Sequence, residues 1–241
     1  MFCCWSPDGV RDFGDWAGRD VQYVVDFSLR RTWNDIANPF DQLKSWQDED
    51  YRIVFGLAML PEDDSLDVSL AAGARGDYDE YYRTLAQNLV AYGQGDAVLR
   101  LGWEFNLGSW RWHPGEADDF IAYWRRVVTT MRAVPGAEGL AFDWNVNNGG
   151  NTYDSTRFYP GRDYVDYVAS TCTTSPGPRA PTLPGHVLHD LPASASGQGL
   201  ERHLRLALRP AVLVEIRGAA GEADVAAGVG AVGAAGRARR R

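Results

Sequence analysis

Residues Val98 to Trp112 read VLRLGWEFNLGSWRW, and this stretch places one carboxylate, Glu104, directly after a short apolar run. Such a run is typical of a strand that is buried on both faces. Parallel β/α barrels keep their chemistry at the carboxyl ends of strands of this kind. The position therefore makes Glu104 a candidate for a catalytic role. The structural alternative is a strand-end glutamate that caps a helix or pairs with Arg100, and the motif alone favours neither.

Three tryptophans, Trp103, Trp110 and Trp112, lie close to this glutamate in the sequence. Their flat apolar faces suit sugar rings, and they would keep water away from the carboxyl group, which favours the protonated form that a general acid needs. The nine Trp and the 12% aromatic content of the chain fit such a site, although aromatic residues also fill cores. We predict a carbohydrate site here, and a tryptophan-rich core is the alternative.

Composition narrows the class of protein further. The 241 residues are 45% hydrophobic, which fits one domain with a core, and no apolar run approaches the roughly 18 residues of a membrane span. The net charge of −8 argues against a nucleic acid as the main partner. The three cysteines and four histidines match no metal site or disulfide framework, so we expect no cofactor and no metal. The chain as given opens without the pattern of a secretory signal peptide.

The composition changes abruptly near residue 170. Residues 171–241 contain no aromatic residue, no Lys and no Asn, and their nine Arg and five acidic residues give a net charge of +4. Since the whole chain carries −8, residues 1–170 carry −12. We therefore divide the chain into a partial β/α-barrel domain, 1–170, and a Gly/Ala/Arg-rich tail, 171–241. The tail is either a disordered basic extension or a segment read out of frame, and we favour the second because shifted frames permit an aromatic-rich sequence.

Residues 1–170 alternate between short apolar runs and helical patterns. We predict strands at residues 21–28, 52–60, 97–105 and 139–146, with a weaker first strand at 2–5. Helical patterns cover residues 81–92 and 120–131, and a short helix is expected at 40–46. This alternation gives about five β/α units, which leaves a doubly wound sheet and an eight-fold barrel open. No glycine-rich phosphate loop or Gly-x-Ser-x-Gly elbow follows any of the strands.

Three segments together resemble glycoside hydrolase family 26, the β-mannanase-like and related β-glucan-cleaving enzymes. They are RLGWEFNLGSWRW, FDWNVNNGG at 142–150 and FYPGRDYVDYVAS at 158–170. The resemblance covers about residues 20–170 and implies a (β/α)8 TIM-type barrel, incomplete here and followed by an irregular or disordered tail. It implies retaining hydrolysis of β-glycosidic bonds in a mannan or glucan, with Glu104 as the acid/base. It also implies an extracellular monomer whose partner is a polysaccharide or oligosaccharide, with no nucleic acid and no membrane.

Further side chains complete the predicted substrate site. Asn106 could bond a sugar hydroxyl, with a turn-forming Asn as its alternative. Trp144 and Asn147 lie where the next strand ends, and core packing is equally open for Trp144. The predicted substrate-binding residues are Trp103, Asn106, Trp110, Trp112, Trp144 and Asn147. Arg100, within the strand, is expected to orient Glu104.

Retaining hydrolysis needs a second carboxyl group roughly 5 Å from the first. The resemblance places this nucleophile after a seventh strand, in an SLPEWG element that appears only in a shifted frame. Glu215 follows an apolar run in the frame as written, but an isolated Glu in an Arg-rich segment is usually a solvated charge. We therefore expect this chain not to hydrolyse its substrate. The alternative is a non-catalytic carbohydrate-binding pseudoenzyme that keeps the tryptophan cleft.

Overall fold

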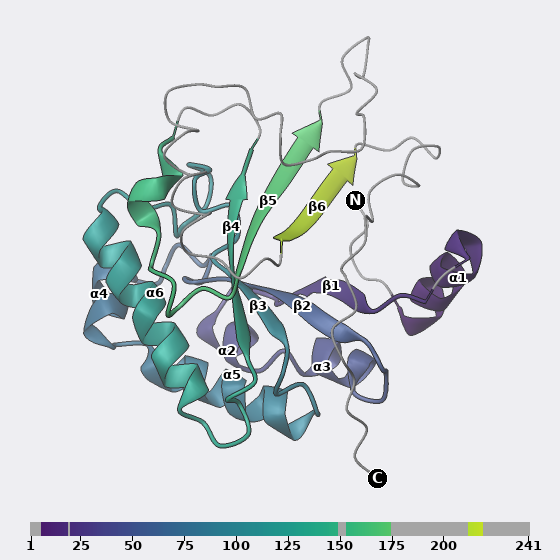
Figure 1. The fold of residues 1–241 in the computed structure, drawn as a ribbon. Coiled ribbons are helices and arrows are strands. Elements are labelled where there is room, and N and C mark those ends of the chain that lie inside the picture. Colours follow the sequence, from purple (N-terminus) through teal and green to yellow (C-terminus); the bar gives the residue numbers. More distant parts are fainter. Residues whose placement is uncertain (1–5, 19, 149–152, 175–211, 219–241) are drawn as a thin grey trace.

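The computed structural model describes residues 6–18, 20–148, 153–174 and 212–218 (Figure 1). In this part of the chain six strands form one sheet in the order β1-β2-β3-β4-β5-β6, and every neighbouring pair is parallel. The strand order follows the chain without reversal, whereas a doubly wound sheet reverses at a switch point. The sheet also curls, with helices on its outer side. The fold is therefore a partial TIM-type barrel, as predicted.

The strands alternate with helices on the outside of the sheet. The strands are β1 Tyr23–Phe27, β2 Arg52–Leu57, β3 Val98–Leu101, β4 Ala141–Asn147, β5 Tyr167–Thr174 and β6 Val212–Gly218. The helices are α1 Pro7–Ala17, α2 Trp33–Ala37, α3 Phe40–Trp46, α4 Leu70–Arg75, α5 Asp79–Ala91 and α6 Ala117–Arg132, with a short 3-10 helix η1 at Ser155–Phe158. Within the described ranges, no helix has the length and apolar character needed to cross a membrane.

The main predicted strands and the three predicted helices each overlap an observed element, whereas α1, α2, α4 and η1 were not predicted. The short helix at 40–46 is confirmed, three of the four main predicted strands contain an observed one, and β4 extends one residue beyond the predicted 139–146. The weaker first strand at 2–5 lies outside the described residues. Strand β5 was not predicted and crosses the proposed boundary at residue 170, and β6 lies within the segment expected to be irregular.

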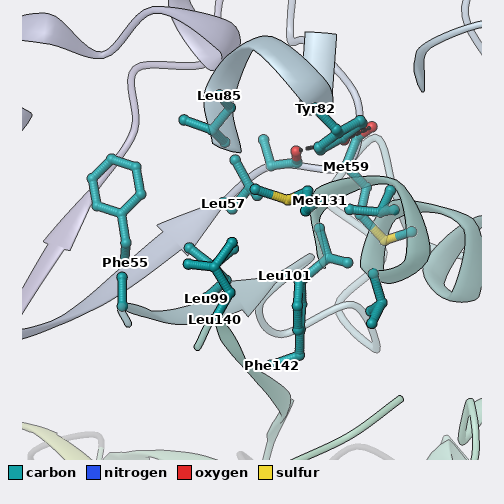
Figure 2. Close-up of a cluster of buried hydrophobic side chains, with 14 of the residues drawn as sticks. Phe55, Leu57, Met59, Tyr82, Leu85, Leu99, Leu101, Met131, Leu140 and Phe142 are labelled. Atoms are coloured by element: carbon teal, nitrogen blue, oxygen red, sulfur yellow. Dashed lines mark hydrogen bonds between the residues drawn. The ribbon is translucent and has the colours of Figure 1, made fainter. Parts of the chain in front are cut away.

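Side chains on the strands alternate between two layers, because successive residues of a strand point to opposite faces. Toward the helices, Phe55, Leu57, Leu99 and Leu101 pack in one large cluster with Leu85 and Met131 (Figure 2). On the other face, Val54, Val98 and Ala141 form a small separate cluster, with Val25 and Tyr167 packed against it. This second cluster is the floor of the barrel interior. Two residues further along β3 and β4 the interior becomes polar, with Arg100 and Asp143.

Two buried tyrosines in the outer layer fix the end of β2. The hydroxyl groups of Tyr82 and Tyr123 donate to the carbonyl oxygen of Met59 at 2.9 and 2.8 Å, and the two oxygens lie 3.1 Å apart. Burial raises the pKa of Tyr82 above its ordinary value, and burial together with the neighbouring Tyr82 raises the pKa of Tyr123 well above it. Both phenols therefore stay protonated in the folded chain at a pH where an unfolded chain has lost the proton.

We expect the free energy of unfolding to fall once the pH exceeds about 10, the ordinary pKa of tyrosine. Above that value the unfolded chain binds fewer protons than the folded one, so stability falls by up to about 1.4 kcal/mol per pH unit for each phenol. Urea unfolding at about pH 8 and about pH 11 measures this loss. Tyr123→Phe removes one titrating group and should show a smaller alkaline loss, whereas Tyr23→Phe, at an exposed position, should not. An equal loss in all three proteins would contradict this assignment.

Candidate active site

Glu104 lies in the turn that directly follows β3, at the carboxyl end of the strand. Its φ is 51°, and among the described residues it is the one non-glycine with a positive φ. Backbone in this region costs a non-glycine residue of order 1–3 kcal/mol and concentrates at functional sites. The residue is 6% exposed. The sequence prediction of a carboxylate at a strand end is therefore met, and the strained backbone adds a feature that the sequence did not indicate.

Hydrogen bonds to both neighbouring strands hold this turn. The backbone N–H of Gly102 donates to the carbonyl oxygen of Leu57 on β2 at 2.8 Å, and that of Glu104 donates to the carbonyl oxygen of Asn145 on β4 at 3.1 Å. Gly102 also has a positive φ, of 54°, and a Cβ there would lie 2.7 Å from the sulfur of Met59. The turn therefore requires glycine at 102, and its two anchors impose the strained conformation on Glu104.

Two asparagines connect the loop after β3 to the end of β4 and reach the carboxylate. The side chain of Asn106 both accepts from the backbone N–H of Asn147 and donates to its carbonyl oxygen, each at 2.8 Å. The amide Nδ2 of Asn147 donates to Oε1 of Glu104 at 3.0 Å. The structure thus brings Asn106, Asn147 and Glu104 together. Both polar atoms of the Asn106 side chain serve the backbone, so this residue positions Asn147.

Two further polar residues, missed by the sequence analysis, extend this network. Oδ1 of Asn145 accepts from the backbone N–H of Glu104 at 3.2 Å, and Nδ2 of Asn145 donates to Oγ1 of Thr171 on β5 at 3.2 Å. A signal for Asn145 was present, because Asp143, Asn145 and Asn147 alternate along β4 and so share one face of the strand. Thr171 lay beyond the predicted domain boundary and had no comparable pattern.

Arg100 has a different partner from the one predicted. Its Nε donates to Oδ2 of Asp143 at 2.7 Å, and both side chains are almost completely buried in the barrel interior. The expectation that Arg100 orients Glu104 is replaced by this ion pair, which joins β3 to β4 below the level of the glutamate. The reason is the alternation of the strand, since Arg100 and Asp143 face the same interior layer.

The three tryptophans around Glu104 pack mainly on one another. Trp110 stacks on Trp112 with centroids 4.8 Å apart and planes at 8°, and Trp103 meets both rings edge-on. Trp103 and Trp112 are 2% and 0% exposed, and Nε1 of Trp112 donates to the carbonyl oxygen of Trp103 at 3.1 Å. The guanidinium of Arg30 lies over the rings of Trp103 and Trp110 at 5.5 and 5.3 Å. Of the three, only Trp110 keeps partial exposure.

Trp144 lies on the other face of the sheet from the polar network. It is fully buried in the helix-facing cluster, where it packs against Phe105 and Tyr159. Positions 144 and 147 differ by an odd number, so their side chains point to opposite faces of β4. The geometry therefore favours the core-packing alternative for Trp144 over contact with a sugar.

The other features that could belong to the Glu104 site are Glu215, the remaining candidate carboxylate, and two surface hollows. Glu215 lies in β6 with its Cα in register with that of Thr171, and its side chain lies outside the described part of the structure. Two hollows in the described part lie elsewhere, one beside α1 and one between α2 and α5, and Glu104 lines neither of them.

Similarity to known proteins agrees with this arrangement. The chain is 28% identical over 181 residues to Endoglucanase H of Acetivibrio thermocellus, an alignment that covers 68% of this chain and 18% of the endoglucanase. The structure of GH26C from Muricauda sp. MAR_2010_75 aligns with a TM-score of 0.50 at 16% identity, covering 67% of this chain and 53% of that one. The chain has the fold of glycoside hydrolase family 26.

A second structural alignment is with the YdhT protein from Bacillus subtilis, with a TM-score of 0.50, 16% identity, and coverage of 68% of this chain and 57% of that one. No family model matches the chain. The chain therefore spans about half the length of these two structures and under a fifth of the endoglucanase. The similarity in fold therefore concerns the partial barrel that carries Glu104.

Proposed function

We propose that the chain is a glycoside hydrolase of the family 26 type that acts on β-linked mannan or glucan, with Glu104 as the acid/base of a retaining mechanism. The observation that carries this proposal is the placement of Glu104. It is a buried carboxylate at the carboxyl end of a barrel strand, with a strained backbone and with one oxygen bonded to Asn147 from the next strand.

In this mechanism the two oxygens of Glu104 have separate tasks. Oε1 is held by the amide of Asn147, which leaves Oε2 to carry the proton. That proton passes to the glycosidic oxygen while the bond to the anomeric carbon breaks and a second carboxyl group bonds to that carbon. Glu104 then takes a proton from the water that releases the sugar. Asn106 acts through Asn147, because it fixes the backbone that carries the amide.

Trp110 is the proposed sugar platform of the site. It keeps partial exposure and lies with Arg30 at the rim, whereas Trp103 and Trp112 are buried beneath and beside it. Trp112 stacks on the indole of Trp110 and Arg30 lies over its ring, so the sugar would contact the part of the ring that stays exposed, which is already fixed in place. Trp103 and Trp112 then support the platform and do not contact sugar themselves.

This chain by itself is proposed to lack the covalent step. The resemblance places the nucleophile after a seventh strand, and the residues that the structure describes form six. We also propose that the division near residue 170 reflects small insertions or deletions that put residues 171–241 out of frame. Sequencing the gene between the codons for Ala169 and Leu200 tests this, and an unchanged frame there would argue for a genuine basic tail.

The catalytic role of Glu104 can be tested by supplying the missing nucleophile. With azide added, the nitrogen bonds to the anomeric carbon, the bond to an aryl leaving group breaks, and Glu104 gives that group its proton. We expect azide-dependent release of 4-nitrophenol from aryl β-mannobioside or β-cellobioside, measured by absorbance. Glu104→Gln should reduce this release by about 10²–10⁴-fold, and much less for a 2,4-dinitrophenyl leaving group, which needs little protonation.

Glu116→Gln, an exposed glutamate in the same loop, is the matched control and should behave as the unaltered chain. Hydrolysis of glucomannan or mixed-linkage glucan without azide would contradict the missing nucleophile. Equal azide-dependent rates for the unaltered chain and Glu104→Gln would contradict the role of Glu104. Binding of polysaccharide by the chain with no cleavage even in the presence of azide would favour the second candidate, a non-catalytic carbohydrate-binding protein. The six described strands also permit this candidate.

A further inference from the structure

A hollow of about 470 Å³ lies on the outer side of the barrel between α2 and α5. Figure 1 shows these two helices side by side on the outer side of the sheet. The hollow is lined from α2, α5 and the loop after β2, chiefly by Thr32, Trp33, Asn34, Leu66, Glu80 and Tyr81. Its volume falls within the range of about 300–1,000 Å³ that is typical of small-ligand sites.

A rigid aromatic pair forms the apolar part of this hollow. Trp33 and Tyr81 stack with centroids 4.6 Å apart and planes at 4°. The ring of Trp33 also packs against the rings of Tyr78 and Tyr82, with centroids 4.4 and 6.3 Å away. Both of these tyrosines are buried, so they fix the position of Trp33 from the core side. Tyr81 itself is 37% exposed, whereas the adjacent Tyr82 is buried. The result is a flat ring at the surface, held by its neighbours.

Polar groups flank the ring pair. Oδ1 of Asn34 accepts from Nδ2 of Asn38 at 3.0 Å, and Nδ2 of Asn34 has no hydrogen-bond partner among the residues that the structure describes. Glu80 also lines the hollow and pairs with Arg83. A carboxylate and an amide beside a flat apolar ring match the two faces of a sugar, whose C–H groups stack and whose hydroxyls bond. The carboxylate and the −12 charge of residues 1–170 oppose an anionic ligand.

We infer that this hollow is a second carbohydrate site, which binds an uncharged β-linked oligosaccharide segment by stacking on Tyr81. Thr32 in its lining is two residues after Arg30, which lies over Trp103 and Trp110. The ligand class rests on the proposed function. Binding at this hollow requires neither Glu104 nor a nucleophile. The chain should therefore bind oligosaccharide there even though it is proposed to lack the nucleophile.

The test is native affinity electrophoresis of the full chain in gels that contain glucomannan or mixed-linkage β-glucan. We expect both polymers to retard the chain and polygalacturonate, which is anionic, to leave its mobility unchanged. Tyr81→Ala should weaken retardation about tenfold, because the stacking surface is lost, whereas Tyr81→Phe keeps the ring and should stay within about twofold. Trp16→Ala, which removes another exposed aromatic residue, is the matched control and should have no effect.

Each other outcome overturns this inference. Absence of retardation of the unaltered chain excludes the site, and equal losses in Tyr81→Ala and Trp16→Ala remove the specific role of Tyr81. Thermal unfolding of the variants distinguishes loss of binding from loss of the fold. If Glu104→Gln abolishes retardation while Tyr81→Ala does not, the binding belongs to the Glu104 site, and the proposed function stands without the second site.

Discussion

Asp143→Ala is expected to lower the free energy of unfolding by about 3–5 kcal/mol, the range found when one partner of a buried ion pair is removed. Arg100 is 1% exposed in the barrel interior and donates to Oδ2 of Asp143 at 2.7 Å. Without that carboxylate, a guanidinium that water scarcely reaches loses a buried ion pair that joins β3 to β4. Urea unfolding followed by tryptophan fluorescence measures the change.

The matched control replaces both charges. Arg100→Met combined with Asp143→Leu fills the same interior with apolar side chains, and we expect it to recover most of the stability that Asp143→Ala loses. A loss below about 1 kcal/mol in Asp143→Ala would show that the pair contributes little to the joint between the strands.

Trp112→Ala is expected to lower the free energy of unfolding by about 3–5 kcal/mol, as truncation of a fully buried indole does. Trp112 is 0% exposed, stacks on Trp110 and donates through Nε1 to the carbonyl oxygen of Trp103. Trp110→Ala removes a ring of the same size from a partly exposed position and should cost clearly less, about 1–2 kcal/mol. Urea unfolding of both variants gives the comparison.

These two variants separate a core role from a sugar-binding role. If Trp110 is the platform, Trp110→Ala should lower the affinity of the Glu104 site for polysaccharide and should lower the free energy of unfolding less than Trp112→Ala does. Equal losses of stability in the two variants would instead place all three tryptophans in the core. That result would support the alternative in which the aromatic residues around Glu104 only fill space.

The position of Glu104 could be predicted because it depends on local order along the chain. An apolar run ended by Gly102 predicts a buried strand and a turn, and parallel strands carry their functional residues at that end. The polar alternation of Asp143, Asn145 and Asn147 could likewise have predicted one polar face on β4. Applied to Trp144, the same rule places it on the opposite face from Asn147.

The contacts that depend on the register between strands could not be read from the sequence. The pairing of Val98 with Ala141 brings Arg100 beside Asp143, and nothing in either segment fixes that offset. Strand β5 was missed because its polar residues, SerThrCysThrThr, lack the apolar run that marked the other strands. The left-handed backbone of Glu104 also depends on bonds that join its turn to both neighbouring strands, from Gly102 to β2 and from Glu104 to β4.

That backbone has a consequence for any effort to improve this protein. Glycine and asparagine occupy the left-handed region more easily than glutamate does, so a selection for heat tolerance alone would replace Glu104 among the first residues. The surviving variants would be more stable and would lack the carboxylate on which the proposed acid/base role depends. A screen for stability in this barrel therefore needs a simultaneous assay of azide-dependent 4-nitrophenol release, because stability and the proposed acid/base role make opposite demands on position 104.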